Sequence, residues 1–379
     1  MFIRKLSLVS FKNYAELVLE LHPKLNCFVG DNGVGKTNLL DAAYYLCMCK
    51  SYFSSNDQFT IRTNDEFMIL QAEFSKEEKK EELYCGLKKG KKKQFRRNRK
   101  EYERLSDHIG MFPVVMVSPN DIQLIIEGSE ERRKYLNGVI SQYDKLYLEQ
   151  LIQYNRILAQ RNRLLKDFRE QGSQEDLLDI LDVQIAASGM EIYRKRKDFI
   201  SKFIPVFNEY YHVISGGNEN VELQYDSQLD EGEFMGLLKE SRSRDLMLQF
   251  TTTGIHKDDL TLNLDNNLIK RIGSQGQQKT YLVALKFAQF EFLRRIKKIP
   301  PLLLLDDVFD KLDAKRVKNI LRLVDQESFG QIFITHTNQD RMKAILHELK
   351  LEHSLYRVEK GNVKLIGEEK NLRTEKKKP

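Results

Sequence analysis

The chain has 379 residues, 41% of them hydrophobic, and a formal net charge of +7. This length is enough for two or three packed domains. No apolar run approaches the roughly 20 residues of a membrane-spanning helix, and the start, MFIRKLSLVSFKNY, lacks the apolar stretch of a secretory signal. Four cysteines without a CxxC pair argue against a zinc site or a disulfide framework. We therefore expect a cytoplasmic protein with no membrane partner.

The first third of the chain has strand patterns on both sides of a glycine-rich loop. Residues 2–8 and 17–21 are predicted as paired strands, and 25–29 as a buried strand that leads into the loop. A helix over 37–49 follows the loop. Four further strands (MILQAEF, ELYCGLKKG, KQFRRNRKEY and FPVVMVS) are predicted to form a meander over 67–117.

The apolar period changes at about Pro119. From Leu136 to Phe168 apolar residues recur mostly at spacings of three, four and seven, as on one face of a helix. A second helix is predicted over 177–207, which Pro205 should end or kink. We therefore predict a helical arm, or second lobe, over 121–249 that is inserted between two halves of another domain.

Strand patterns return at about Phe250. A helix over 277–297 precedes the buried strand of PLLLLDDVFD, and IFITHT at 332–337 is another buried strand. The resulting fold class is α/β, with one domain built from residues 1–120 and 250–366. A basic, disordered tail is predicted over 367–379.

The pattern GxxxxGKT lies between a predicted strand and a predicted helix, where a phosphate-binding loop (Walker A) belongs. Backbone N–H groups and the positive helix end can surround phosphates there. Lys36 can reach the β- and γ-phosphates, and Thr37 can offer its hydroxyl to Mg²⁺. The residues assigned to ATP binding are Gly30, Asp31, Asn32, Gly33, Val34, Gly35, Lys36, Thr37 and Asn38.

Two acids follow a run of four leucines. Such a run suits a strand buried on both faces, and parallel sheets present their ligands at the carboxyl ends of strands. This pattern is typical of a Walker B motif, in which Asp306 would hold Mg²⁺ and Asp307 would polarise the attacking water. The expected cofactors are ATP and Mg²⁺. An acid pair that only caps a helix is the alternative, and the phosphate-binding loop in the same chain argues against it.

A serine and a glycine open the helix that precedes the leucine run. The N-terminus of that helix offers free N–H groups and a dipole to a second phosphate. One nucleotide does not need two such cradles in one subunit, so this pattern favours a signature segment that faces the γ-phosphate on a partner subunit. An N-cap with a flexible loop is the alternative. The segment comprises Ser274, Gln275, Gly276, Gln277 and Gln278.

The stretch from Lys88 to Lys100 is rich in Lys and Arg and contains no acid. Basic clusters attract nucleic acids through phosphate contacts and counterion release. A solvated hairpin face is the alternative. The residues assigned to DNA contact are Lys91, Lys92, Lys93, Arg96, Arg97 and Arg99.

The order of these motifs resembles the ABC-type ATPase heads of chromosome and DNA-repair proteins. It is more similar still to the RecF family of bacterial recombination proteins. That resemblance is carried by FKNY at 11–14, VSPNDIQLIIEGSEERRKYLN at 117–137, RDLMLQFTTTGIHKDDL at 244–260 and the signature segment itself. It extends from the first residues to about Thr337.

The resemblance implies an ABC-type head with a mixed β-sheet and an inserted helical lobe. Two heads would form an ATP-dependent homodimer around two ATP molecules. Ser274 and Gly276 would contact the γ-phosphate across the interface, and Asp313 would belong to the D-loop at its seam. His336 would be the switch histidine, completing a catalytic set with Lys36 and the two Walker B acids.

Members of this family bind double-stranded and gapped DNA. The resemblance implies action with RecO and RecR to place RecA on single strands. Asp307 stands where transporter heads commonly carry glutamate, and a shorter acid holds water less closely. Weak ATP hydrolysis that acts as a timer is therefore expected.

Three other functions remain open at this point. A transporter-type ATPase subunit would need a coupling surface for membrane helices. The ATPase head of another chromosome-organising or repair complex would need a longer coiled coil than residues 119–250 provide. A scaffold that a nucleotide merely holds in shape would show no ATP turnover.

Overall fold

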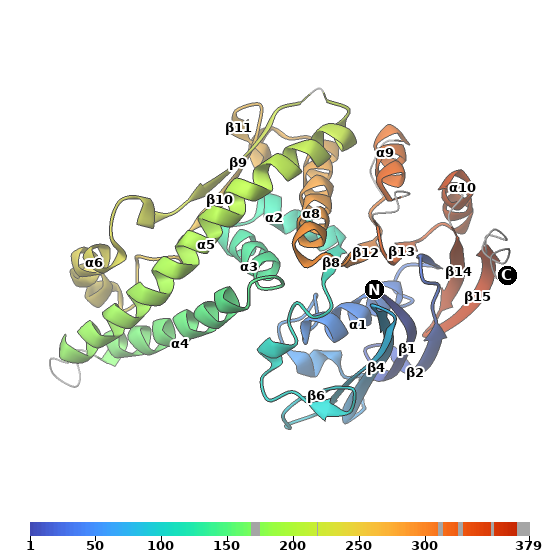
Figure 1. Ribbon diagram of the computed structural model, residues 1–379, viewed down its shortest axis with the longest axis horizontal. Coiled ribbons are helices and arrows are strands. Elements are labelled where there is room, and N and C mark those ends of the chain that lie inside the picture. The colour runs from blue at the N-terminus through green and yellow to red at the C-terminus, as the bar shows by residue number, and fades with distance from the viewer. Residues whose placement is uncertain (168–174, 218, 310–313, 325–328, 350–351, 370–379) are drawn as a thin grey trace. The chain divides into compact units, whose positions relative to one another are not determined.

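The structure is a computed structural model that describes residues 1–167, 175–217, 219–309, 314–324, 329–349 and 352–369. The chain forms two compact units (Figure 1). The first unit combines the two ends of the chain, up to Asp121 and from Lys279 onward, and the second unit is 122–278. No helix among the described residues is both long enough and apolar enough to cross a membrane.

An antiparallel sheet opens the first unit. Its strands, in sheet order, are β2 (Tyr14–Glu20), β1 (Phe2–Phe11), β4 (Phe67–Lys76), β5 (Lys79–Lys88), β6 (Gln94–Arg97) and β7 (Lys100–Glu101). Buried and exposed residues largely alternate along β1, β4 and β5, as in a sheet with one face on the core and one in water. The pair of strands predicted at 2–8 and 17–21 is confirmed.

The segment KQFRRNRKEY is not the single strand that its sequence predicts. It forms a hairpin of β6 and β7 whose two-residue turn consists of Asn98 and Arg99. Both turn residues have a positive φ, 51° and 68°, which suits the tight turns of hairpins and interrupts the strand. Glu81 on β5 accepts hydrogen bonds from the side chains of Arg97 and Asn98, so the turn is anchored to the sheet.

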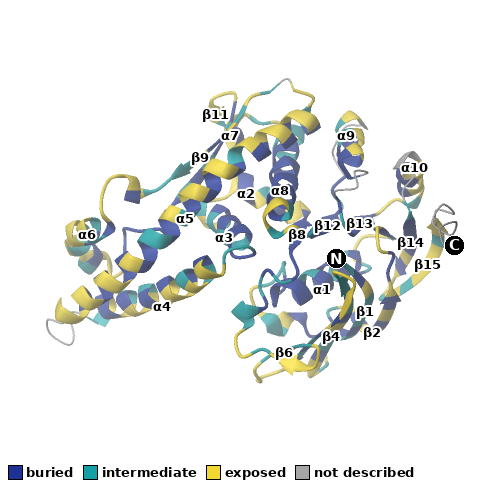
Figure 2. Cartoon of the chain, viewed as in Figure 1, coloured by how far each residue is buried: buried dark blue, intermediate teal, exposed yellow. Residues whose placement is uncertain are grey.

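A second, mixed sheet completes the first unit. Its order is β15 (Asn362–Glu369), β14 (His353–Glu359), β3 (Leu25–Val29), β13 (Ile332–His336), β12 (Leu302–Asp306) and β8 (Val114–Val117). All pairs are parallel except that of β15 with β14. The central strands are buried throughout, whereas β15 at the edge is largely exposed (Figure 2).

One part of the predicted meander is wrong. FPVVMVS contains β8, which pairs with β12 in the mixed sheet rather than with the antiparallel strands. The physical reason lies in the run VVMV. It lacks the alternation of apolar and polar residues found in half-exposed strands, and every position is buried. Such a strand is stable only where both faces of the sheet are covered.

Helix α1 (Lys36–Met48) contacts strands of both sheets, and its buried side chains share one core with the inner face of the antiparallel sheet. The helix predicted at 37–49 is thereby confirmed. The remaining helices of this unit are η1 (Asp57–Thr60), η2 (Leu105–Asp107), most of η3 (Pro119–Ile122) and of α8 (Gln275–Lys297), α9 (Ala314–Val324) and α10 (Gln339–Leu349).

The predicted tail begins too early. Residues 367–369 belong to β15, where they pair with β14. The rest of the predicted tail, 370–379, lies outside the described residues.

The second unit combines helices with a small antiparallel sheet. Its helices are α2 (Gln123–Ile126), α3 (Ser129–Ile140), α4 (Lys145–Asp167), α5 (Glu175–Ser215), η4 (Gln228–Asp230), α6 (Phe234–Leu248) and α7 (Ile269–Ile272). Its sheet has the order β11 (Asn267–Leu268), β10 (Asp259–Leu264) and β9 (Val221–Asp226). Helices α4 and α5 pack along each other.

The predicted boundary at 249/250 is corrected to 278/279. Sequence reasoning placed the strand pattern after Phe250 in the ATPase head because it treated the inserted lobe as helical. In the structure β10 pairs with β9 along six residues, so its backbone hydrogen bonds stay within the second unit. Residues 250–278, including the signature segment, therefore belong to the inserted lobe.

Pro205 does not end its helix, because α5 continues to Ser215. A proline inside a helix removes one hydrogen bond and costs about 3 kcal/mol. Phe207, Tyr210, Tyr211 and Ile214, in the turns after the proline, are all buried. Burial of such side chains contributes about 1.5–3 kcal/mol each, which offsets the loss.

Candidate nucleotide-binding site

The loop from Gly30 to Asn38 joins the end of β3 to the start of α1. Gly35 has a φ of +113°, and a Cβ at this position would lie 2.3 Å from Nδ2 of Asn13. The backbone conformation favours glycine, and any Cβ here would also displace the Asn13 side chain. The loop thus places backbone N–H groups at the N-terminus of a buried helix, which is a site that favours phosphate.

Lys36 folds back over this loop. Its Nζ donates hydrogen bonds to the carbonyl oxygens of Gly30 and Asp31, each at 2.8 Å. Burial lowers the pKa of the Lys36 ammonium, and the carboxylates of Asp307 and Asp306 oppose that shift. The loop therefore holds the lysine charge beside its own backbone.

Asp306 ends β12 and accepts hydrogen bonds from two threonines. Thr37 Oγ1 lies 2.9 Å from each carboxylate oxygen, and Thr335 Oγ1 on β13 lies 2.7 Å from Oδ1. Burial raises the pKa of the Asp306 carboxyl, and both threonine hydrogen bonds act in the opposite direction. The two residues predicted as metal ligands, Thr37 and Asp306, are in direct contact.

The donor set fits Mg²⁺. This ion prefers oxygen ligands and is usually bound through one or two carboxylates together with phosphate oxygens and water. Thr37 and Asp306 supply one hydroxyl and one carboxylate. Within the described ranges, no group of three or more His, Cys, Asp or Glu side chains could hold a metal ion. A metal ion held by Thr37 and Asp306 would take its remaining ligands from the phosphates of a nucleotide and from water.

Asp307 and His336 lie at the carboxyl ends of β12 and β13. Asp307 has a left-handed backbone, with a φ of 44°, and its N–H donates to Thr335 Oγ1 at 3.0 Å. The carbonyl of His336 accepts the Gly30 N–H at 3.3 Å, and its Nδ1 accepts the Asn338 N–H at 3.0 Å. Since Nδ1 is an acceptor, the neutral ring carries its proton on Nε2.

All four residues predicted to be catalytic therefore come from one edge of the mixed sheet. Lys36 follows β3, His336 ends β13, and the acid pair ends β12 or follows it. These strands are neighbours in the order β3, β13, β12. Parallel neighbours present their carboxyl ends together, which explains how distant parts of the sequence meet.

The turn between β1 and β2 braces the phosphate-binding loop, a role that sequence reasoning missed. Asn13 Nδ2 donates to the Val34 carbonyl at 3.0 Å, and Asn13 Oδ1 accepts from Asn38 Nδ2 at 2.7 Å. The Tyr14 hydroxyl donates to the Gly35 carbonyl at 2.9 Å. The available signal was FKNY, which contains both residues but entered only as part of the family resemblance.

A chain of buried polar contacts links α1 to α8. Asp41 on α1 is fully buried, pairs with Lys12 Nζ at 2.6 Å and accepts the Tyr52 N–H at 2.7 Å. The Tyr52 hydroxyl bonds Asp121, and Lys286 on α8 contacts both Asp121, at 3.1 Å, and the Tyr52 hydroxyl, at 2.9 Å. The first turn after α1 is thus tied to the helix that the signature segment opens.

The signature segment forms the start of α8. Ser274 is a reciprocal cap: its N–H donates to Gln277 Oε1 at 2.8 Å, and its Oγ accepts the Gln277 N–H at 3.2 Å. Gln278 Nε2 donates to the Gly273 carbonyl at 3.1 Å. The N-cap that sequence analysis named as the alternative is present, and it leaves the proposed contact with a partner's phosphate as a prediction. Asp313 of the predicted D-loop lies outside the described residues.

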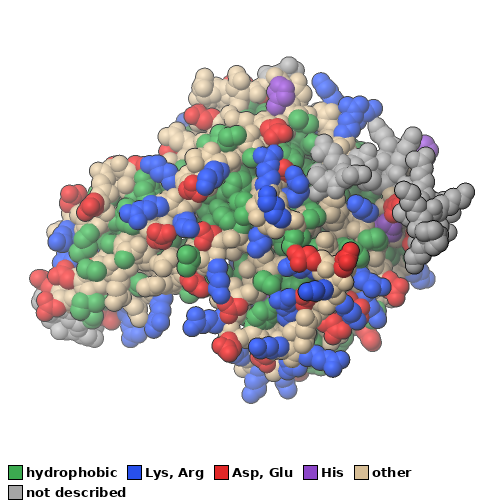
Figure 3. Space-filling model, in the orientation of Figure 1, with side chains coloured by type: hydrophobic (Ala, Val, Ile, Leu, Met, Phe, Trp, Pro, Cys, Tyr) green, Lys and Arg blue, Asp and Glu red, His purple; other side chains and the backbone are tan. Residues whose placement is uncertain are grey.

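The predicted DNA residues differ in their surroundings. Lys93 Nζ contacts Asp57 at 2.6 Å and the Cys49 carbonyl at 2.5 Å, and Arg97 pairs with Glu81 at 2.6 Å. These two charges are matched inside the first unit, which gives them a structural role. Of the four remaining candidates, three are exposed and Arg96 is half-buried: Lys91, Lys92, Arg96 and Arg99. Asp and Glu side chains are interspersed among Lys and Arg on the visible face of the molecule (Figure 3).

The fold and the site together define an ATPase head of the SMC and ABC type with an inserted lobe. The family model of the RecF/RecN/SMC N-terminal domain matches residues 2–362. The chain belongs to the RecF family. It is 49% identical over 368 residues to the DNA replication and repair protein RecF of Parabacteroides distasonis, covering 97% of this chain and all of that relative. It is 47% identical to RecF of Flavobacterium johnsoniae, over 94% of this chain and 99% of the relative.

Solved structures support the same assignment. The recombination mediator protein RecF of the RecFOR pathway, solved as RecF-ATP, is 30% identical with a TM-score of 0.87, over 97% of this chain and 98% of that one. The same protein solved as RecF-ATPrS has a TM-score of 0.86 with the same identity and coverage. An SMC head bound to the C-terminal winged-helix domain of ScpA is 16% identical with a TM-score of 0.59, over 99% of this chain and all of that one; this likeness shows the shared fold. The family resemblance and the predicted fold class are confirmed.

Proposed function

We propose that this protein is an ATP-dependent switch that hydrolyses its nucleotide slowly. The phosphate-binding loop and Lys36 bind the phosphates, and Thr37 and Asp306 hold Mg²⁺, which would neutralise phosphate charge during hydrolysis. Asp307 orients the attacking water, and its short side chain makes turnover slow. The observation that carries the proposal is the 2.9 Å contact between Thr37 and Asp306, because it brings both expected metal ligands to the end of the loop.

The switch acts through dimerisation. The N-terminus of α8 bears Ser274 and Gly276 in the second unit, whereas the phosphate-binding loop belongs to the first. We infer that the signature segment completes the nucleotide site of a second copy, with Asp313 at the seam and His336 near the γ-phosphate. A ligand shifts an association equilibrium only through differential affinity, and this ATP-bridged contact supplies it.

The dimer binds double-stranded and gapped DNA in recombinational repair. It acts with RecO and RecR to load RecA. Membership of the RecF family supports this assignment, as do relatives named DNA replication and repair proteins and structures assigned to the RecFOR pathway. The exposed cations Lys91, Lys92 and Arg99 are candidates for phosphate contacts. Such contacts imply that affinity falls steeply with salt.

Mass measurement in solution tests the switch. The chain alone should be largely monomeric, and ATP with Mg²⁺ should shift it to a dimer. A gapped duplex should bind to the dimer and not to the monomer. Lys36→Ala is the matched control, since it should neither bind ATP nor dimerise. DNA affinity that is the same with and without ATP across a salt titration would refute the switch.

A further inference from the structure

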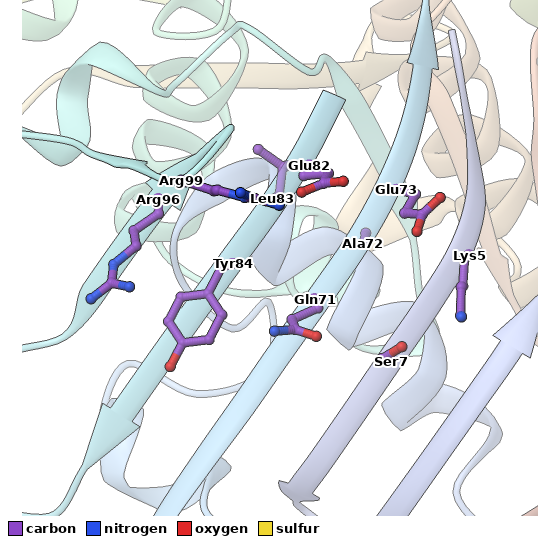
Figure 4. A pocket seen from close by; sticks show the side chains of 10 residues that line it. All are labelled: Lys5, Ser7, Gln71, Ala72, Glu73, Glu82, Leu83, Tyr84, Arg96 and Arg99. Carbon is purple, nitrogen blue, oxygen red and sulfur yellow. The ribbon is translucent and has the colours of Figure 1, made fainter. Parts of the chain in front are cut away.

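The outer face of the antiparallel sheet carries a cavity of about 360 Å³ that the nucleotide site does not use. Its lining comes from β1, β4, β5 and β6 and from the turn after β6 (Figure 4). The side chains that project over this face include Lys5, Ser7, Gln71, Tyr84, Arg96 and Arg99. They are polar, aromatic or basic.

Four of these residues form one row across the sheet. Arg96 on β6 is the register partner of Tyr84 on β5, Tyr84 pairs with Gln71 on β4, and Gln71 pairs with Ser7 on β1. Neighbouring strands lie about 4.8 Å apart, so such partners lie side by side. The row therefore presents a ring, an amide and a hydroxyl in a line, with a guanidinium at one end.

The ring of Tyr84 lies flat along the sheet. A Cβ at Gly86 would be 2.6 Å from the Tyr84 hydroxyl and 3.1 Å from two ring carbons. Glycine at this position thus leaves the space that the ring occupies. The Arg96 guanidinium lies 5.4 Å from the ring centroid, within cation–π range. Two planar groups are therefore placed together on a regular, hydrogen-bonded scaffold.

Positive charge flanks this row. Arg99 sits in the turn that Asn98 anchors through its bonds to Glu81 and to the Glu82 N–H. Lys5 lies at the opposite side of the cavity, on β1.

Acidic side chains are also present. Glu73 and Glu82 both pair with Lys80, at 3.2 and 3.1 Å, and Arg96 lies 3.9 Å from Glu101. The lining holds three cations, Lys5, Arg96 and Arg99, and two acids, so its own net charge is positive. Lys80, outside the lining, offsets part of the charge of the two acids.

We propose that this cavity binds a short single-stranded segment of DNA. A base would stack on the Tyr84–Arg96 pair, Gln71 and Ser7 would bond base or sugar atoms, and Lys5 and Arg99 would contact phosphates. Aromatic groups on a sheet with flanking cations are the general means of binding unpaired bases. This inference rests on the proposed function and narrows it, since it assigns the unpaired part of a gapped duplex to this face.

A protein ligand fits this face less well. The apolar residues of the lining, Ala72 and Leu83, are 4% and 2% exposed, so they belong to the core. Interfaces between proteins need a desolvated centre with apolar anchors. Tyr84 is the one large ring in the lining.

The test uses the full chain with ATP and Mg²⁺, a fluorescent oligothymidylate and a blunt duplex. Tyr84→Leu should weaken oligothymidylate binding about tenfold, as expected for one lost base stack, and leave duplex binding unchanged. Gly86→Val should have a similar effect because it displaces the ring. Phe67→Leu is the control, since Phe67 is an exposed aromatic residue of β4 outside the cavity lining.

Arg96→Glu gives an independent answer if Tyr84→Leu fails to fold, because it changes charge on an outward side chain. It should weaken oligothymidylate binding more than duplex binding. Equal affinities of wild type and variants for oligothymidylate, or equal weakening for both DNAs, would each overturn the proposal. Wild-type protein that binds neither DNA in the presence of ATP would instead overturn the proposed function.

Discussion

The Thr37 hydroxyl and the Asp306 carboxylate are in contact at 2.9 Å although they are 269 positions apart in the sequence. Thr37 lies in the first turn of α1, which follows β3, and Asp306 ends β12. Strands β3 and β12 are separated only by β13, whose Thr335 donates a hydrogen bond to the same carboxylate. The order of the strands in the sheet thus brings the two groups together. Preorganised ligands reduce the ordering cost of binding, so this contact prepares the site for a metal–nucleotide complex.

Replacing the Thr37 hydroxyl should remove the benefit of Mg²⁺. Thr37→Val keeps the side-chain shape but supplies no oxygen, so we expect Mg²⁺ to strengthen ATP binding far less than in the wild type and ATP turnover to fall at least tenfold. ATP titrations with and without Mg²⁺ measure the effect. Thr37→Ser is the control because it retains the hydroxyl. Unchanged Mg²⁺ dependence in Thr37→Val would remove Thr37 from the metal site.

Asp307→Asn should preserve ATP binding and trap the dimer. The amide cannot accept a proton from the attacking water, and loss of a general base typically costs 10²–10⁴-fold in rate. Turnover measurements, together with the solution mass over time, would show both effects. Asp307→Glu is the comparator, since it keeps a carboxylate and should retain turnover. An Asp307→Asn variant that hydrolyses ATP at the wild-type rate would refute the role of Asp307.

Substitution of Ser274 separates nucleotide binding from dimerisation. Ser274→Arg should bind ATP as a monomer, because a bulky side chain obstructs the partner's phosphate. Arginine also removes the helix cap, a loss of about 1 kcal/mol. Ser274→Asp retains a capping oxygen and repels phosphate, so it should stay as stable as wild type and yet fail to dimerise. Sedimentation in the presence of ATP measures dimerisation. A dimer of either variant would contradict the proposed contact between Ser274 and the nucleotide of the partner subunit.

The elements that sequence reasoning located best are those with local signals. The strand at 25–29 agrees with β3, and the helix at 37–49 lies within one residue of α1 at each end. Lys36 and Thr37 are adjacent in a short motif, and the backbone of that motif itself forms the phosphate-binding loop. Uninterrupted apolar runs and a glycine loop leave few alternative structures, which explains this agreement.

Two of the errors, the placements of β8 and of β10, share one physical origin, the choice of a distant partner. Nothing within VVMV says that β8 pairs with β12, and nothing within TLNL says that β10 pairs with β9. Sheet pairing joins residues far apart in the chain, so local composition does not determine it. The contact of Lys93 with Asp57, 36 residues away, is likewise not indicated by local composition.

Asn13→Ala should weaken ATP binding, although Asn13 is not one of the residues assigned to ATP binding. It removes two hydrogen bonds that hold the phosphate-binding loop, each worth about 1 kcal/mol, so we expect up to about a 30-fold loss in affinity. Asn38→Ala removes one of the two bonds and should give a smaller loss. ATP titration measures both, and thermal unfolding reports the cost to the fold. Wild-type affinity in Asn13→Ala would show that the loop needs no brace.

Acid should destabilise the first unit through His108. Burial lowers the pKa of this histidine to about 4, and its ring nitrogens lie 2.8 Å from the Leu46 carbonyl and 3.0 Å from the Tyr102 hydroxyl. The unfolded chain takes up the proton near pH 6.5, so between about pH 6.5 and 4 it binds more protons than the folded chain. The free energy of unfolding should therefore decrease as the pH is lowered through this window, by up to about 1.4 kcal/mol per pH unit. Above the window His108 should make no contribution to the pH dependence. Urea unfolding of wild type and His108→Gln across pH 4–7 gives the slope of the free energy of unfolding against pH for each protein. The slope should be shallower for His108→Gln. Identical slopes would mean that His108 is protonated as readily in the folded chain as in the unfolded one.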